Sequence, residues 1–200
     1  KQKISFENPY NLDVIALGGK EKEHLVLLFK IRAGAIVNKD TFWLNRAIDE
    51  DESQLMEFFL KRYYADRSDI RTEILLSHLP EGIEVLQSWL QAEKGRKVRL
   101  RVPQRGEKKN LLDMVVNNVA LLWQEKYEKE QKNQAILKQL SQVLNLEVVP
   151  QRIECYDISH LSGDETVASM VVFTGGIADR KAYRRFKMKI DQNDDFASLS

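Results

Sequence analysis

An aspartate stands at the centre of an apolar run that reads as a β-strand, residues 152–160. Side chains alternate across a strand, so Asp157 shares one face with Ile153 and Cys155. A carboxylate among apolar neighbours is costly unless a cation pairs with it. Mg²⁺ prefers oxygen ligands, and paired metal ions drive phosphodiester hydrolysis. Two interpretations follow: Asp157 is a metal-binding carboxylate, or it ends a strand and caps a turn at Ser159–His160.

Four further residues near this strand are candidates for the same chemistry. His160 is expected to contact DNA or a metal-bound water, or else to bond only the backbone as a turn histidine. Asp195 either brings a second carboxylate to the metal or begins a helix, where the dipole favours an acidic side chain. Arg184 and Arg185 follow Tyr183, and the guanidinium fork suits phosphate. The alternative for the two arginines is a solvated strand face.

A basic loop over residues 103–109 offers a second place for phosphate contacts. Arg105, Lys108 and Lys109 cluster there, and such cations neutralise nucleic-acid phosphates. A merely solvated loop is the alternative. The net charge is only +1, from 31 Lys and Arg against 30 Asp and Glu, so any nucleic-acid binding depends on local patches.

Composition bounds the class of protein. A chain of 200 residues allows one or two domains. The single cysteine, Cys155, rules out an intrachain disulfide and favours a reducing compartment, and within an apolar strand it is expected to be a small core residue. No apolar run approaches the ~20 residues of a membrane span, and no signal-peptide pattern opens the chain. The start at Lys1 and the abrupt end predict an interior piece of a longer protein.

Two similar three-stranded patterns surround these residues. Alternating and apolar runs predict strands over 12–17, 24–31 and 35–44, and again over 152–160, 166–173 and 182–188. Glycine-containing turns are predicted at Ala33–Gly34 and Gly175–Gly176.

The two patterns superpose, with Phe29 on Phe173 and Ala16 on Asp157. We interpret this as an internal duplication in which one copy keeps a carboxylate and the other has lost it. Chance similarity between two meanders is the alternative.

Helices and strands alternate after the first pattern. The spacing predicts helices over 51–64, 82–92 and 110–124, the last continuing to about 143, and strands over 73–78 and 97–102. Gly95 is expected to end the second helix. The predicted order is three antiparallel strands followed by helix, strand, helix, strand and helix. This is the ribonuclease H-like order, a mixed sheet with helices on both faces. On the apolar faces, the three tryptophans are expected to be core rather than base-stacking platforms: Trp43, Trp89 and Trp123.

The fold class expected is therefore α/β, a duplicated ribonuclease H-like mixed sheet with flanking helices. Residues 1–125 are predicted to form one complete copy, 126–149 a charged helical connector, and 150–200 the first three strands of a truncated second copy. The first copy is expected to be inactive, because Ser77 and Asn118 stand where further metal ligands are wanted.

The runs that carry Asp157 and the arginines resemble those of the UvrC family, the incision subunits of the bacterial excinuclease. The matching runs are Arg152–His160, Glu165–Phe173, Tyr183–Phe186 and Asp194–Ala197, with weaker similarity at 59–64 and 103–109. The resemblance covers essentially the whole chain and places 152–197 at the start of the family's C-terminal endonuclease domain.

The resemblance implies a cytoplasmic DNA-repair nuclease that acts on damaged duplex DNA and cuts 5′ of the lesion with Mg²⁺ or Mn²⁺. Asp157 matches the family's first catalytic aspartate, and Asp195 matches a further acidic position. It also implies that the remaining catalytic ligands lie beyond Ser200, and that the UvrB-docking segment lies before Lys1. The chain alone is therefore expected to be inactive. The rival interpretations are a non-catalytic module that binds DNA or protein, and a different ribonuclease H-like enzyme such as a resolvase or transposase.

Overall fold

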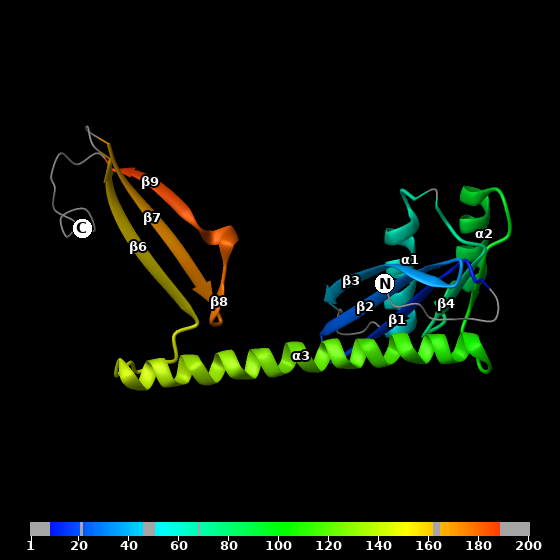
Figure 1. The fold of residues 1–200 in the computed structure, drawn as a ribbon, viewed down its shortest axis with the longest axis horizontal. Coiled ribbons are helices and arrows are strands. Elements are labelled where there is room, and N and C mark those ends of the chain that lie inside the picture. The colour runs from blue at the N-terminus through cyan, green and yellow to red at the C-terminus, as the bar shows by residue number, and fades with distance from the viewer. Residues whose placement is uncertain (1–8, 21, 46–50, 68, 162–164, 189–200) are drawn as a thin grey trace. The chain divides into compact units, whose positions relative to one another are not determined.

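The computed structural model describes residues 9–188, except 21, 46–50, 68 and 162–164 (Figure 1). The chain divides into two compact units, Lys1–Glu125 and Lys126–Ser200.

The first unit is built on a mixed five-stranded sheet. Its strands lie in the order β3-β2-β1-β4-β5. The pairs β1–β2 and β2–β3 are antiparallel, whereas β1–β4 and β4–β5 are parallel. Their bounds are β1 Leu12–Lys20, β2 Glu23–Arg32, β3 Ala35–Asn45, β4 Glu73–Leu76 and β5 Arg99–Arg101.

Local signals explain where the helices of this unit begin and end. Helix α1, Glu52–Tyr64, opens on a capping box in which the Asp51 carboxylate accepts from the backbone N–H of Gln54 and the Gln54 side chain accepts from the Asp51 N–H. Helix α2, Ile83–Lys94, ends at Gly95 in the left-handed conformation with φ 71°, as the sequence predicts.

The sheet is covered on both faces, because β1 and β2 are buried throughout most of their length. Ile15 and Leu17 join a core with α1 and α2, whereas Val14 and Ala16 join a second core with helix α3. The predicted mixed sheet with helices on both faces is thus confirmed for this unit.

Helix α3 runs without a break over Glu107–Val143, 37 residues. The charged stretch after residue 125 continues the helix because it holds no Gly or Pro and consists mostly of good helix formers. Lys126 and Glu130, one turn apart, add an ion pair of 3.5 Å. No helix in the described ranges is both long and apolar enough to cross a membrane.

The second unit has a smaller antiparallel sheet. Strand β7 lies at its centre, paired with β6 on one side and with β8 and β9 on the other. The bounds are β6 Arg152–Leu161, β7 Glu165–Thr174, β8 Ile177–Ala178 and β9 Arg184–Met188. The last predicted strand is shorter than expected, because a 3₁₀ turn occupies Arg180–Ala182.

Both predicted hairpin turns are present. Ala33 and Gly34 have φ of 48° and 72°, and Gly175 and Gly176 have φ of 58° and 78°. Two successive residues at positive φ are typical of type I′ turns, whose twist matches that of the flanking strands. Both units therefore begin with three antiparallel strands in the same neighbour order, as predicted.

Candidate functional site

Asp157 lies inside the β6–β7 ladder, where it pairs with Ser169. The strand continues through His160, whose backbone pairs with Thr166, to Leu161. The interpretations of Asp157 as the cap of a turn and of His160 as a turn histidine are therefore wrong, because strand pairing continues past both residues. The Asp157 side chain is exposed, and its role as a metal ligand stays a prediction.

A row of side chains crosses the small sheet at Asp157. Asp157 pairs with Ser169, which pairs in turn with Arg185 of β9. Residues opposite one another in a sheet point to the same face, so the carboxylate and the guanidinium share a face two strands apart, about 10 Å at the usual strand spacing. Arg185 is exposed and forms no ion pair with any residue that the structure describes.

Arg184 points to the opposite face, since neighbours in a strand alternate. It pairs with Met170. Its Nη1 donates to the carbonyl oxygens of Lys181 at 2.9 Å and Tyr183 at 2.8 Å. The two arginines therefore cannot contact one ligand from the same face.

The face behind Asp157 carries a small polar cluster. Tyr156 Oη donates to Glu154 Oε2 at 2.5 Å, and Arg152 Nε donates to Glu154 Oε1 at 2.7 Å. The bond from Tyr156, followed by that from Arg152, lowers the pKa of Glu154. The bond between Tyr156 and Glu154 also raises the pKa of Tyr156. The cluster occupies its own donors and acceptors on the face away from Asp157.

Cys155 is exposed, so the prediction that it is a core residue is wrong. Its neighbours on that face, Asp157 and Val171, are exposed or half-buried, so the described residues put no covering layer there. Asp195 lies outside the described residues.

The strand pairing shows that two of the predicted equivalences are incompatible. Phe29 pairs with Val14, and Phe173 pairs with Ile153. Aligning the two phenylalanines therefore brings Gly18, not Ala16, onto Asp157. The two proposed equivalences differ by two residues and cannot both hold.

Neither Ala16 nor Gly18 offers a ligand atom, so the prediction of a lost carboxylate does not depend on which equivalence is kept. Near them, the Ser77 hydroxyl accepts from the Leu17 backbone N–H at 2.9 Å and lies 3.0 Å from His78 Nδ1. Asn118 donates to the carbonyl of Met114, one turn back in α3, at 2.8 Å. Ser77 and Asn118 thus make contacts within the fold.

Within the described ranges, no three His, Cys, Asp or Glu side chains gather closely enough to hold a metal ion. A two-metal site needs several carboxylates. The described residues therefore do not by themselves complete a metal site, and Asp157 is the one predicted carboxylate ligand among them.

The basic segment is less free than the sequence suggests. Helix α3 begins at Glu107, so Lys108 and Lys109 lie in its first turn, not in a loop. Lys108 Nζ contacts Glu73 Oε2 at 2.6 Å, and Lys109 pairs with Asp113. Arg105 remains exposed and without an ion pair in the described part of the chain.

A buried charge network in the first unit was missed from the sequence. Asp13 of β1 is 1% exposed. Arg32 Nη1 donates to its Oδ1 at 2.8 Å, and Tyr64 Oη donates to its Oδ2 at 2.8 Å. Burial and then the negative charge of Asp13 raise the pKa of Tyr64 well above its ordinary value. The signal was present, since Asp13, like Asp157, stands among apolar residues in a strand.

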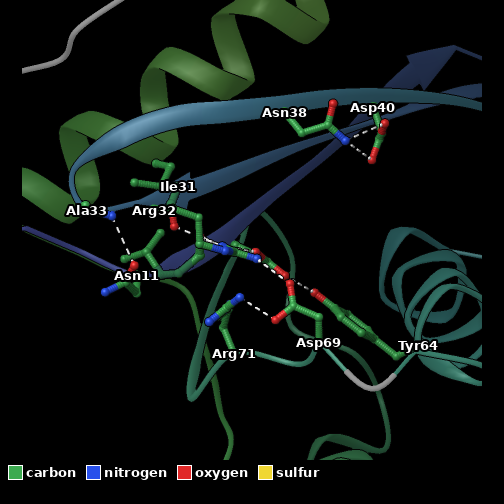
Figure 2. A network of polar contacts seen from close by, with 11 residues as sticks. Asn11, Ile31, Arg32, Ala33, Asn38, Asp40, Tyr64, Asp69 and Arg71 are labelled. Atoms are coloured by element: carbon green, nitrogen blue, oxygen red, sulfur yellow. Dashed lines mark hydrogen bonds and ion pairs between the residues drawn. The ribbon is translucent and has the colours of Figure 1, made fainter.

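The network continues to the surface. Arg32 Nη2 reaches Asp69 Oδ2 at 3.3 Å, and Asp69 also pairs with Arg71. Figure 2 shows Arg32, Tyr64, Asp69 and Arg71 converging. Burial alone would raise the pKa of Asp69, but the bonds from Arg71 and Arg32 outweigh it and lower that pKa. With its cation already in place, Asp13 has the contacts of a structural residue.

Comparison with known proteins gives two family matches in succession. The family model described as UvrC Ribonuclease H-like domain matches residues 11–126, and the model described as UvrC RNAse H endonuclease domain matches residues 141–200.

Several curated relatives align over the whole chain. UvrABC system protein C of Syntrophomonas wolfei is 56% identical over 200 residues, that of Symbiobacterium thermophilum 38% over 204, and that of Alkaliphilus oremlandii 41% over 205. In each case all of this chain aligns with 32–33% of the relative. The chain thus spans about a third of the length of these relatives.

Proposed function

The chain belongs to the UvrC family, and on that basis we propose that it is part of a nucleotide excision repair endonuclease that incises damaged DNA. The observation that carries the proposal is the succession of two UvrC family matches, residues 11–126 and 141–200, over nearly the whole chain. The relatives are named as components of a UvrABC system. We therefore include damaged duplex DNA and UvrB among the partners of the whole protein, and the bacterial cytoplasm as its place of action.

Asp157 is the residue to which we assign metal binding in the 5′ incision. Its side chain is exposed and belongs to a residue inside a strand, and Mg²⁺ or Mn²⁺ would take the carboxylate as one oxygen ligand. The bound ion would supply activation of water and stabilisation of the leaving oxygen. Asp195 is proposed as a further ligand. Arg185, on the same face, is proposed to hold a DNA phosphate, and the proposed contact from His160 rests on sequence alone.

The first unit is proposed as a non-catalytic positioning domain. Neither Ala16 nor Gly18 supplies a carboxylate, and the nearby Ser77 and Asn118 serve contacts within the fold. The exposed Arg105 is its proposed phosphate contact, with Lys108 and Lys109 contributing less because each is paired with a carboxylate.

The test is incision by the full-length protein carrying Asp157→Asn, assayed with its system partners on duplex DNA that holds one lesion and is labelled at both ends. The change keeps the shape but removes the anionic ligand. We expect 5′ incision to fall more than about hundredfold, because metal ligation contributes several kcal/mol to the transition state, with DNA binding and 3′ incision retained.

The matched control is Glu154→Gln, which removes a carboxylate from the other face of the same strand and should leave 5′ incision near normal. Near-normal 5′ incision by Asp157→Asn would refute the assignment. The 200-residue chain by itself is expected to show no metal-dependent cleavage. Cleavage by that chain, lost on Asp157→Ala, would overturn the proposal that further ligands are needed.

A further inference from the structure

One short segment of the first unit concentrates positive charge. Residues 94–105, called here the basic segment, hold six of the 31 Lys and Arg of the chain and none of its 30 Asp and Glu. The net charge of the whole chain is only +1, so this charge is a local feature that acidic residues elsewhere balance. The six cations are Lys94, Arg96, Lys97, Arg99, Arg101 and Arg105.

The fold turns the cations of this segment towards solvent. Val98 and Leu100 are 2% and 4% exposed and belong to the core with α1 and α2. Side chains alternate along a strand, so Arg99 and Arg101 of β5 point away from that core, and both are exposed. Lys97, on the approach to the strand, is exposed as well. The apolar residues of the segment thus anchor it, and the charged ones form its surface.

Few of these cations are neutralised within the fold. Arg101 pairs with Glu73 at 2.6 Å. Burial, followed by the positive charges of Arg96 and Arg71, lowers the pKa of Lys94. An anion at this surface would therefore relieve repulsion between like charges. Five of the six cations form no ion pair with any residue that the structure describes: Lys94, Arg96, Lys97, Arg99 and Arg105.

The composition of this surface fits a nucleic-acid backbone better than a protein. Protein interfaces are built around apolar and aromatic anchors and are depleted in lysine, whereas Val98 and Leu100 face the core. The centre of the β5 edge is also closed to an added peptide strand, because the Leu100 backbone N–H donates to the Gln87 side chain at 2.9 Å. Contacts to DNA phosphates come from cationic side chains and need no apolar anchor.

The spacing of the cations also suits a phosphate backbone. Arg99 and Arg101 are two positions apart in β5, or about 6.6 Å in an extended chain. Each strand of duplex DNA carries a phosphate every ~3.4 Å along the axis, so such a pair can follow every second phosphate. Past Arg101 lies a hollow of about 540 Å³, which Arg105 and Lys108 also line against one acidic residue, Glu107. Cations therefore continue from β5 to the proposed phosphate contact at Arg105.

We propose that the basic segment is a track for the phosphate backbone of duplex DNA, with Arg96, Lys97 and Arg99 as phosphate contacts. Such contacts fix the position of a protein on DNA and carry no sequence information of their own. The inference rests on the proposed function, in which damaged duplex DNA is the substrate, and extends the DNA contact of the first unit from Arg105 to β5.

The experiment measures binding of a fluorescent duplex with one lesion to the full-length protein over a range of salt concentrations. The variant that combines Arg96→Gln, Lys97→Gln and Arg99→Gln should lower the salt slope of binding by about 2–3, because each lost phosphate contact removes about 0.9. At about 0.1 M salt its affinity should fall at least about tenfold. Urea unfolding shows whether the variant is folded; if it is not, Lys97→Gln alone should lower the slope by about one.

A control of equal charge separates direct contact from a change in net charge. It combines Lys20→Gln, Lys22→Gln and Arg62→Gln, three exposed cations without an ion pair in the described ranges, and should change the slope by less than about one. Arg96→Lys with Arg99→Lys should also keep the slope, because a phosphate accepts either cation.

Three outcomes would overturn the proposal. They are an unchanged slope in the folded triple variant, an equal loss of slope in the control, and loss of UvrB binding by the triple variant with its DNA binding intact, which would indicate a protein partner. Incision by the unchanged protein keeps the two proposals apart. If the unchanged protein does not incise damaged duplex, the proposed function fails; if it incises and the triple variant binds DNA as before, only the basic segment is wrongly assigned.

Discussion

Replacing Arg32 by methionine tests whether the buried network holds the first unit together. The change keeps a long apolar stem but removes the cation that lies 2.8 Å from Asp13. Asp13 is 1% exposed, so its charge would be left with the Tyr64 hydroxyl alone. Breaking a buried ion pair in this way costs about 3–5 kcal/mol, which is a large part of the 5–15 kcal/mol by which a typical domain is stable.

The measurement is urea unfolding followed by tryptophan fluorescence, because all three tryptophans of the chain lie in the first unit. Arg71→Met is the matched control. It removes an arginine from the exposed end of the same network, where Asp69 is 59% exposed, and a surface pair contributes about 0–1 kcal/mol.

A double-mutant cycle with Asp13→Asn separates the interaction energy between Asp13 and Arg32 from the effect of each substitution alone. Once Asp13 is neutral, losing the Arg32 cation should cost much less, so the coupling energy should reach about 2 kcal/mol or more. If Arg32→Met costs no more than Arg71→Met, or if the two changes at Asp13 and Arg32 simply add, the reasoning is refuted.

Three further outcomes are expected from other parts of the fold. Because the pKa of Tyr64 is raised in the folded protein, the unfolded chain releases the Tyr64 hydroxyl proton first as pH rises. The stability contributed by Tyr64 is therefore intact below about pH 10 and is lost as pH rises above it. Urea unfolding midpoints between pH 9 and 11 should fall less steeply in Tyr64→Phe than in the unchanged protein. Gly18→Val should cost about 1–3 kcal/mol, because even a Cβ there would lie 3.0 Å from Val119 Cγ1, and an unchanged urea midpoint would contradict this. Arg105→Ala in the full-length protein should lower the salt slope of DNA binding by about one, whereas Lys109→Ala should change it less, since Lys109 is already paired.

The sequence predicts best what depends on near neighbours. Gly95 and the Ala33–Gly34 turn each act within a few residues, and the structure confirms the elements that they bound. The alternation of apolar residues likewise predicts the strands, because it reports directly which side chains face a core.

Contacts between distant residues were beyond that reasoning. Asp13 and Arg32 are 19 positions apart, and their approach depends on the register of the β1–β2 pair. The sequence predicts Lys108 to be a loop cation. Its partner Glu73 is 35 positions away in the chain and comes near only because α3 and β4 pack in one core. The apolar strand around Cys155 predicts a core residue, but the burial of Cys155 depends on what covers that strand.

The burial of β1 and β2 bears on where such chains can change length. Side chains in a strand alternate with a period of two, so a slip of two positions leaves every residue facing the same way, whereas a slip of one turns the whole strand inside out. Within β1 and β2, insertions or deletions should therefore be tolerated better in even steps than in odd ones. The turn is not bound by this rule, since Lys20 pairs with Glu23 across two residues and Leu161 with Glu165 across three. An alignment that places a single-residue gap inside either strand would put part of that strand in the wrong register.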